Sequence, residues 1–155
     1  MYRKAFFAIC LNGFALAFTW GITVTNIPWL FDRVGIKETD LGIWFTIFAV
    51  LQLIFSQLSG RVIVPLIGTT KTLMLGQLSF AIFPYIFITA NNIQIFFLSS
   101  IPLSIAAGLI FPTIASSTNF IENKTKRIYQ TYQQASFSFG FIISGIFASL
   151  FFYLN

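Results

Sequence analysis

Residues 72–121 read TLMLGQLSFAIFPYIFITANNIQIFFLSSIPLSIAAGLIFPTIASSTNFI, a stretch of 50 residues without a charged side chain. An α-helix rises about 1.5 Å per residue, so a single helix of this length would measure about 75 Å, whereas the hydrocarbon core of a bilayer is about 30 Å thick. The stretch therefore predicts two membrane-spanning helices. Its most polar point, at Ala90, Asn91 and Asn92, marks the connection between them.

The rest of the chain has the same character. Hydrophobic residues occupy 57% of the 155 positions and charged residues 8%, which is too few to cover a surface exposed to water. Three further charge-free segments, 5–31, 41–60 and 128–155, are each long enough to span a bilayer. We expect an all-α membrane protein with a single transmembrane domain over residues 1–155. Its five helices are predicted at about 5–30, 41–64, 70–90, 94–120 and 130–154.

The cations predict the orientation, because cytoplasmic loops are enriched in Lys and Arg. If the five helices alternate in direction, Arg33 and Lys37 lie on one side of the membrane. The other side then carries seven cations, namely Arg3, Lys4, Arg61, Lys71, Lys124, Lys126 and Arg127. We therefore expect an integral protein of the cell (inner) membrane with its N-terminus in the cytoplasm. The net charge of +5 reflects this topology, and no contiguous basic patch indicates nucleic acid as a partner.

Catalysis is not expected from this composition. The chain has no histidine, a single cysteine (Cys10) and no Asp or Glu inside the predicted helices apart from Glu122 at a cytoplasmic end. General acid–base catalysis and His- or carboxylate-based metal sites both require such groups. The sequence therefore predicts a protein that is not an enzyme and has no cofactor or metal.

Uncharged polar residues are the remaining candidates for a site. On the first helix, Asn12, Thr19, Thr23 and Asn26 fall within an arc of about 60° at 100° per residue, and Trp20 lies beside them. Lipid tails offer no hydrogen bonds, so this polar stripe must face protein or a wet cavity. Either the stripe forms hydrogen bonds to neighbouring helices, or it is a solute-binding face with Trp20 as a stacking platform. Gln133 and Gln134 at the start of the fifth helix have the same two interpretations.

Small residues recur at intervals of four on the last two predicted helices. They are Ser100, Ser104 and Gly108 on one helix, and Ser136, Gly140, Ser144 and Ala148 on the other. Small side chains at this spacing allow helix backbones to approach closely. We expect both rows to pack against neighbouring helices.

Several motifs occur in order along the chain. The stretch FALAFTWGITVTNIPWLFDRVGIKETDLGIWFTIFAVLQLIFSQLSGRV (14–62) contains an Asn-x-Pro exit from the first helix, a short charged outer loop, an Asp-Leu-Gly entry to the second helix and a Gly-Arg pair at its end. QQASFSFGFIISG (133–145) adds a glutamine followed by Ser-x-Gly. Together these motifs resemble the first five of the twelve helices of a major facilitator superfamily transporter, in particular its fucose permease-like branch. The residues that carry the resemblance are Asn26, Pro28, Asp40, Leu41, Gly42, Gly60, Arg61, Gln134, Ser138 and Gly140.

The junction between the second and third helices departs from the superfamily pattern G-x-L-x-D-R-x-G-R-R. Val64 stands at the Asp position, Pro65 at the following Arg, and Gly68 comes one residue late. The carboxylate of the family's charge lock is therefore missing. The remaining motif residues, Gly60, Arg61, Gly68 and Lys71, are expected to anchor this turn. The fifth helix also lacks the Gly-Pro pair typical of the superfamily's drug–proton antiporters.

The resemblance implies a secondary transporter, a permease that moves a small polar solute such as a sugar by alternating access. Its partners would be the lipid bilayer, the solute and the missing C-terminal helices, since the chain ends after five. The branch usually carries a carboxylate at the position of Phe111, so ion coupling would depend on residues outside this chain. The alternative is a membrane scaffold or assembly subunit that transports nothing, or a degenerate transporter fragment.

Overall fold

A computed structural model of the chain describes residues 2–154, and side chains over residues 2–150. Every regular element in this part of the chain is helical, as predicted. The elements are α1 (Tyr2–Thr25), α2 (Ile27–Val34), α3 (Glu38–Leu58), the π-helix η1 (Ser59–Ile63), α4 (Val64–Thr89), α5 (Ile93–Leu98), α6 (Ser100–Thr125) and α7 (Gln130–Leu154). They form two compact units, Met1–Asn26 with Ile114–Asn155 (unit 1) and Ile27–Thr113 (unit 2). The single domain expected from the sequence stays a prediction.

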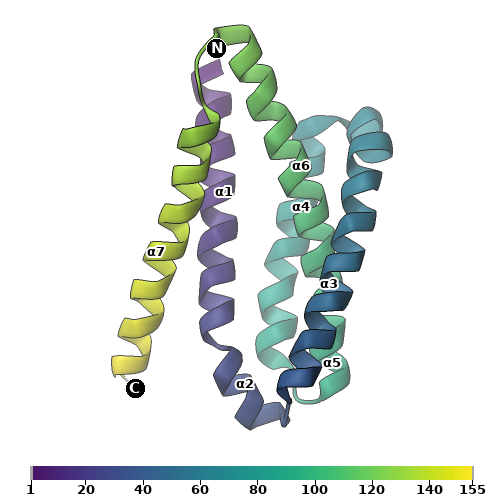
Figure 1. Cartoon of the computed structure of the whole chain (residues 1–155), viewed down its shortest axis with the longest axis vertical. Helices are drawn as coiled ribbons and strands as arrows, with labels where there is room; N and C mark the ends of the chain where they lie inside the picture. Colours follow the sequence, from purple (N-terminus) through teal and green to yellow (C-terminus); the bar gives the residue numbers. More distant parts are fainter. Residues whose placement is uncertain (1, 155) are drawn as a thin grey trace. The chain divides into compact units, whose positions relative to one another are not determined.

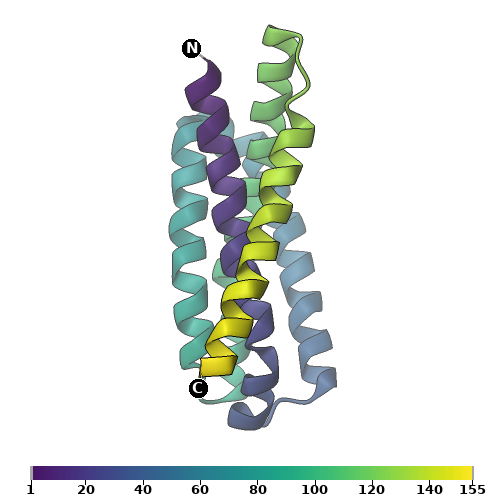
Figure 2. The ribbon, with the colours of Figure 1, turned by 90° about the vertical axis from the view of Figure 1, so that its left-hand side faces the viewer.

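In unit 1, α1 and α7 lie side by side and run in the same direction (Figures 1 and 2). Their contacts follow the same order along both helices. The Ser136 hydroxyl donates to the Cys10 carbonyl at 2.7 Å, and further along Gly140 lies against Phe14 and Ala17. Parallel first and fifth helices are what the alternation of five membrane-spanning helices requires.

Helix α1 ends at Thr25, so the predicted helix 5–30 was too long. Its last turn shows why it stops. The Asn26 amide bonds to the Thr23 carbonyl only three residues back, and the Ile22 carbonyl accepts instead from the Thr25 hydroxyl and the Asn26 side-chain amide, both at 2.7 Å. Pro28 follows within α2, and a proline cannot donate the backbone bond that would continue α1. The Asn-x-Pro motif is thus a helix break capped by its own polar side chains.

Unit 2 is built around a buried tryptophan. In Figure 1, α3 and α4 run in opposite directions and are joined through η1. Trp44 of α3 is 1% exposed, and its ring stacks on Phe96 of α5 with 5.6 Å between centroids and contacts Phe87 of α4 at 6.0 Å. Its indole N–H donates to the Phe96 carbonyl at 3.0 Å and to the Ser99 hydroxyl at 3.1 Å. Burying this N–H without a partner would be costly, so both acceptors help to fix the ring.

The fourth predicted helix, 94–120, differs from the structure at both ends. The observed helical segment begins at Ile93 as α5, is interrupted at Ser99 and continues as α6 to Thr125. Pro102 has no N–H for the Leu98 carbonyl, which accounts for a break at this point. The hydroxyls of Ser99 and Ser100 donate to the carbonyls of the preceding turn at 2.6 and 2.7 Å.

By length and composition, three helical stretches of the described residues could cross a membrane. They are Tyr2–Thr25, Glu38–Thr89 and Ile93–Thr125. The second stretch is 52 residues long. It contains the predicted span 41–64 and all but the last residue of the predicted span 70–90, without the loop expected between them.

Candidate solute-binding face

The polar stripe on α1 does not face α7. Gly13, Ala17 and Gly21 form a row of small α1 residues that lies against α7. At 100° per residue, the centre of this row lies about 150° around the helix from the centre of the stripe formed by Asn12, Thr19, Thr23 and Asn26. The stripe and the contact with α7, where Gln133 lies, therefore occupy different faces of α1.

Three stripe side chains donate hydrogen bonds to their own helix. The Asn12 amide donates to the Ala8 carbonyl at 2.9 Å, the Thr23 hydroxyl to the Thr19 carbonyl at 2.8 Å and the Asn26 amide to the Ile22 carbonyl at 2.7 Å. These bonds do not join α1 to another helix, and they occupy side-chain N–H and O–H donors that a solute-binding face would have left available. Sequence reasoning offered only those two alternatives and missed this third one, which Ser, Thr and Asn commonly adopt in helices.

The accessibility of the stripe varies along its length. Thr23 is 3% exposed, whereas Asn12, Thr19, Trp20 and Asn26 are half-buried. Within the described side chains, the Thr19 hydroxyl has no hydrogen-bond partner. Thr19 and Asn26 are therefore the stripe residues best placed to bind another molecule.

The two glutamines at the start of α7 lie in different environments. Gln133 is 7% exposed, and a Cβ built on Gly13 would lie 3.6 Å from its amide nitrogen. Gln134, the stronger binding candidate by sequence, is exposed. The glutamine level with the first third of α1 is thus Gln133, which fills space beside Gly13.

The α1–α7 contact itself is built from small residues on both helices. A Cβ on Gly140 would lie 2.6 Å from the Phe14 carbonyl oxygen and 2.9 Å from the Ala17 Cβ, and a Cβ on Gly21 would overlap Ser144. This confirms the packing role predicted for the small residues of α7. The complementary row on α1, Gly13-x₃-Ala17-x₃-Gly21, has the same spacing of four and could have been found by the same pattern.

The second predicted row packs within unit 2. The Ser104 hydroxyl donates to the Phe48 carbonyl at 3.1 Å, and a Cβ on Gly108 would lie 2.5 Å from the Phe55 Cβ. Both partners belong to α3, so this row also brings two helices into close contact.

The junction of α3 and α4 has no loop. Residues 59–63 form η1, whose last backbone bond runs from the Val64 N–H to the Ser59 carbonyl, and α4 begins with Pro65 in its first turn. The change of direction is concentrated at Gly68, where φ is 83° and ψ is 163°. This conformation is essentially restricted to glycine. The buried Thr72 hydroxyl donates to the Gly68 carbonyl at 2.9 Å and holds the bend.

The other motif residues at this junction are exposed. Gly60 lies within the π-helix η1 and is not a positive-φ glycine, and a Cβ on it would meet nothing within 4 Å. Arg61 and Lys71 are exposed. The turn is therefore set by Gly68 and Thr72, while the two cations lie at its surface.

Among the described residues, no group of three or more His, Cys, Asp or Glu side chains is placed to hold a metal ion. The polar groups of the α1 stripe and of Gln133 and Gln134 are neutral amides, hydroxyls and one indole. Such a face can bind a solute by hydrogen bonding and stacking, and it offers no charge for an ion pair.

Long apolar helices, polar groups confined to a stripe and helix contacts through small residues define an α-helical integral membrane protein. The family model of the Major Facilitator Superfamily matches residues 9–155, and the chain belongs to this superfamily.

Two curated relatives carry resistance names. Multidrug resistance protein 2 of Bacillus subtilis (strain 168) is 29% identical over 143 residues, which is 91% of this chain and 36% of the relative. Quinolone resistance protein NorA of Staphylococcus aureus (strain Mu50 / ATCC 700699) is 23% identical over 142 residues, with the same two shares. The chain thus spans about a third of the length of these relatives. No solved structure gives a significant match.

Proposed function

We propose that the protein acts as a secondary transporter of the cell membrane, which moves a small organic solute by alternating access. The superfamily match over residues 9–155 carries this proposal. The N-terminus of the protein is proposed to lie in the cytoplasm. Within unit 1, the end that holds the start of α1 and the α6–α7 connection carries Arg3, Lys4, Lys124, Lys126 and Arg127, which supports that orientation.

The solute is proposed to bind to the exposed part of the α1 stripe. The Asn26 side chain bonds to its own helix through its amide N–H, so the lone pairs of its side-chain carbonyl oxygen remain as acceptors. Thr19 offers an unpartnered hydroxyl, and the half-buried Trp20 next to it in the chain contributes an indole ring to this part of α1. Such a face suits an uncharged solute with hydroxyl or N–H donors and a flat apolar side.

Two solute classes meet this description. The names of the two relatives favour an amphiphilic drug-like compound. The neutral polar stripe and the fucose permease-like motifs favour a sugar. In either case a coupling carboxylate is not expected in the middle of the helices of this chain, because the carboxylates of their described part, Asp32, Glu38, Asp40 and Glu122, all lie near helix ends.

The test is transport by the full-length protein in proteoliposomes, with a panel of labelled sugars and of fluorescent amphiphilic cations and quinolones. Thr19→Ala and Asn26→Ala should raise the KM for the transported solute about tenfold, the loss of one to two hydrogen bonds. Thr46→Ala is the matched control, because Thr46 is an exposed threonine of α3 that also bonds to its own helix, at 2.9 Å.

Unchanged KM in both α1 variants would remove the binding face and leave the transporter proposal standing. Absence of transport across the whole panel, from a protein that folds and inserts normally, would favour the scaffold alternative.

A further inference from the structure

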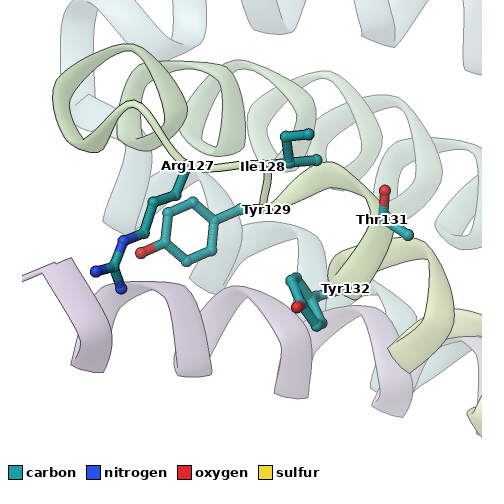
Figure 3. Close-up of a pocket in the computed structure, with 5 residues that line it drawn as sticks. All are labelled: Arg127, Ile128, Tyr129, Thr131 and Tyr132. Atoms are coloured by element: carbon teal, nitrogen blue, oxygen red, sulfur yellow. The ribbon is translucent and has the colours of Figure 1, made fainter.

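A pocket of about 610 Å³ lies in unit 1 between the first turns of α1 and the segment that joins α6 to α7. It is lined by Arg3, Phe6, Phe7, Cys10, Arg127 and Tyr129. A second hollow of about 510 Å³ shares Arg127 and Tyr129 and continues along the start of α7 (Figure 3). Both volumes fall within the range of roughly 300–1,000 Å³ that is usual for small-ligand sites.

The larger pocket brings together two guanidinium groups that are far apart in the sequence. Within the described side chains, neither Arg3 nor Arg127 has an ion pair or a hydrogen bond. Glu122 is the one carboxylate of unit 1, and it accepts from the backbone N–H groups of Tyr129 at 2.6 Å and Gln130 at 2.7 Å. This carboxylate is thus engaged at the start of α7, and the positive charge of the pocket is not compensated.

The walls of the pocket are held in place by other contacts. At the end of α6, Lys126 adopts a left-handed conformation with φ of 56°, and its N–H bonds to the Glu122 carbonyl at 2.8 Å, as in an αL helix cap. The Tyr129 ring packs on Phe6 of α1 with 4.4 Å between centroids. Figure 3 shows Arg127 and Tyr132 extending toward α1 from this segment, whereas Ile128 points away. The two arginines are therefore presented from fixed backbone positions.

We propose that this pocket binds the phosphate group of an anionic lipid. Guanidinium groups form paired hydrogen bonds with phosphate oxygens, and two of them match one phosphodiester. The pocket lies where membrane-spanning helices end, and basic pockets between such helices bind anionic headgroups. Phe6 and Phe7 supply an apolar wall beside the charge, as a glycerol backbone with acyl chains requires and a free phosphate ion does not.

The test uses the full-length protein in nanodiscs of phosphatidylcholine with increasing phosphatidylglycerol, and bound lipid is counted by native mass spectrometry. Arg3→Gln/Arg127→Gln should weaken phosphatidylglycerol binding about 10- to 30-fold, because each arginine near an anionic surface contributes several-fold. Arg61→Gln/Lys71→Gln removes the same charge from unit 2 and should leave this binding unchanged. Arg3→Lys/Arg127→Lys keeps the charge, loses the paired geometry, and should give an intermediate affinity.

A second measurement reads the pocket directly. Cys10 lines the pocket, so maleimide should label it more slowly when phosphatidylglycerol is present, after any cysteine outside residues 1–155 has been replaced by serine. Soluble glycerol phosphate, added to phosphatidylcholine nanodiscs, should give no protection at millimolar concentration. Equal protection by glycerol phosphate would overturn the lipid assignment. Equal lipid binding by the Arg3/Arg127 and Arg61/Lys71 variants, or labelling of Cys10 that ignores phosphatidylglycerol, would overturn the site.

Discussion

Replacing Gly140 by alanine should weaken the packing of α1 on α7. The added methyl carbon would lie 2.6 Å from the Phe14 carbonyl oxygen, 2.9 Å from the Ala17 Cβ and 3.1 Å from the Phe18 nitrogen. Comfortable contacts between non-bonded heavy atoms lie at about 3.5–4.0 Å. Two of the three opposing atoms belong to the backbone, so relief requires the two helices to move apart by about 1 Å rather than a change of rotamer.

The magnitude follows from two opposing effects. Alanine in place of glycine stabilises a helix by about 0.5–1 kcal/mol, whereas overpacking of a close contact costs about 1–3 kcal/mol. Gly145 of the same helix is the matched control, because a Cβ on it would meet nothing within 4 Å. Both variants gain the same helix propensity, so Gly140→Ala should be less stable than Gly145→Ala by about 1–3 kcal/mol.

Thermal unfolding of the full-length protein in detergent, followed by size-exclusion chromatography of a fluorescent fusion, measures this difference. We expect Gly145→Ala to unfold at or above the temperature of the unmodified protein, and Gly140→Ala several degrees below it. If the two alanine variants unfold at the same temperature, the close approach of α1 and α7 through Gly140 is wrong. Ala17→Gly, combined with Gly140→Ala, should restore part of the lost thermal stability, because it removes the Ala17 Cβ that opposes the new methyl group.

Four further predictions address other parts of the chain. A topology reporter fused after Lys126 should report a cytoplasmic location, and one fused near Asn92 an extracytoplasmic location. The reverse pattern would contradict the proposed orientation. Glu122→Ala should destabilise the protein by about 1–3 kcal/mol in a denaturation assay, since two backbone N–H groups lose their acceptor. Glu122→Gln should leave any pH dependence of transport intact. Loss of the pH dependence in this variant would show that Glu122 takes part in ion coupling. Gly68→Ala should cost about 1–3 kcal/mol because of its positive φ, while Gly60→Ala, at a position without a positive φ where an added Cβ meets nothing within 4 Å, should cost nothing measurable. Equal stability of the two glycine variants would contradict the bend at Gly68.

The sequence by itself determined the all-helical membrane class. The charge-free segments are long enough to cross a bilayer. Inside lipid, the backbone N–H and C=O groups of such a segment must be hydrogen-bonded to one another, and an α-helix does this within a single segment. It also predicted the packing rows that contain Gly140 and Gly108, because a spacing of four residues places small side chains on one helix face regardless of the partner. The superfamily could be recognised on the same local evidence, from motifs that occupy helix ends and turns.

Only the tertiary structure decided which face of α1 meets α7. The polar stripe and the small-residue row lie on opposite sides of the same helix, and either could have been the contact surface by sequence. The structure favours the row of Gly13, Ala17 and Gly21, because close backbone approach needs small side chains, whereas Thr23 and Asn26 can satisfy themselves on carbonyls of their own helix. In the same way Arg3 and Arg127 line one pocket only because α1 and α7 are parallel neighbours, a relation between distant segments that no local sequence pattern can show.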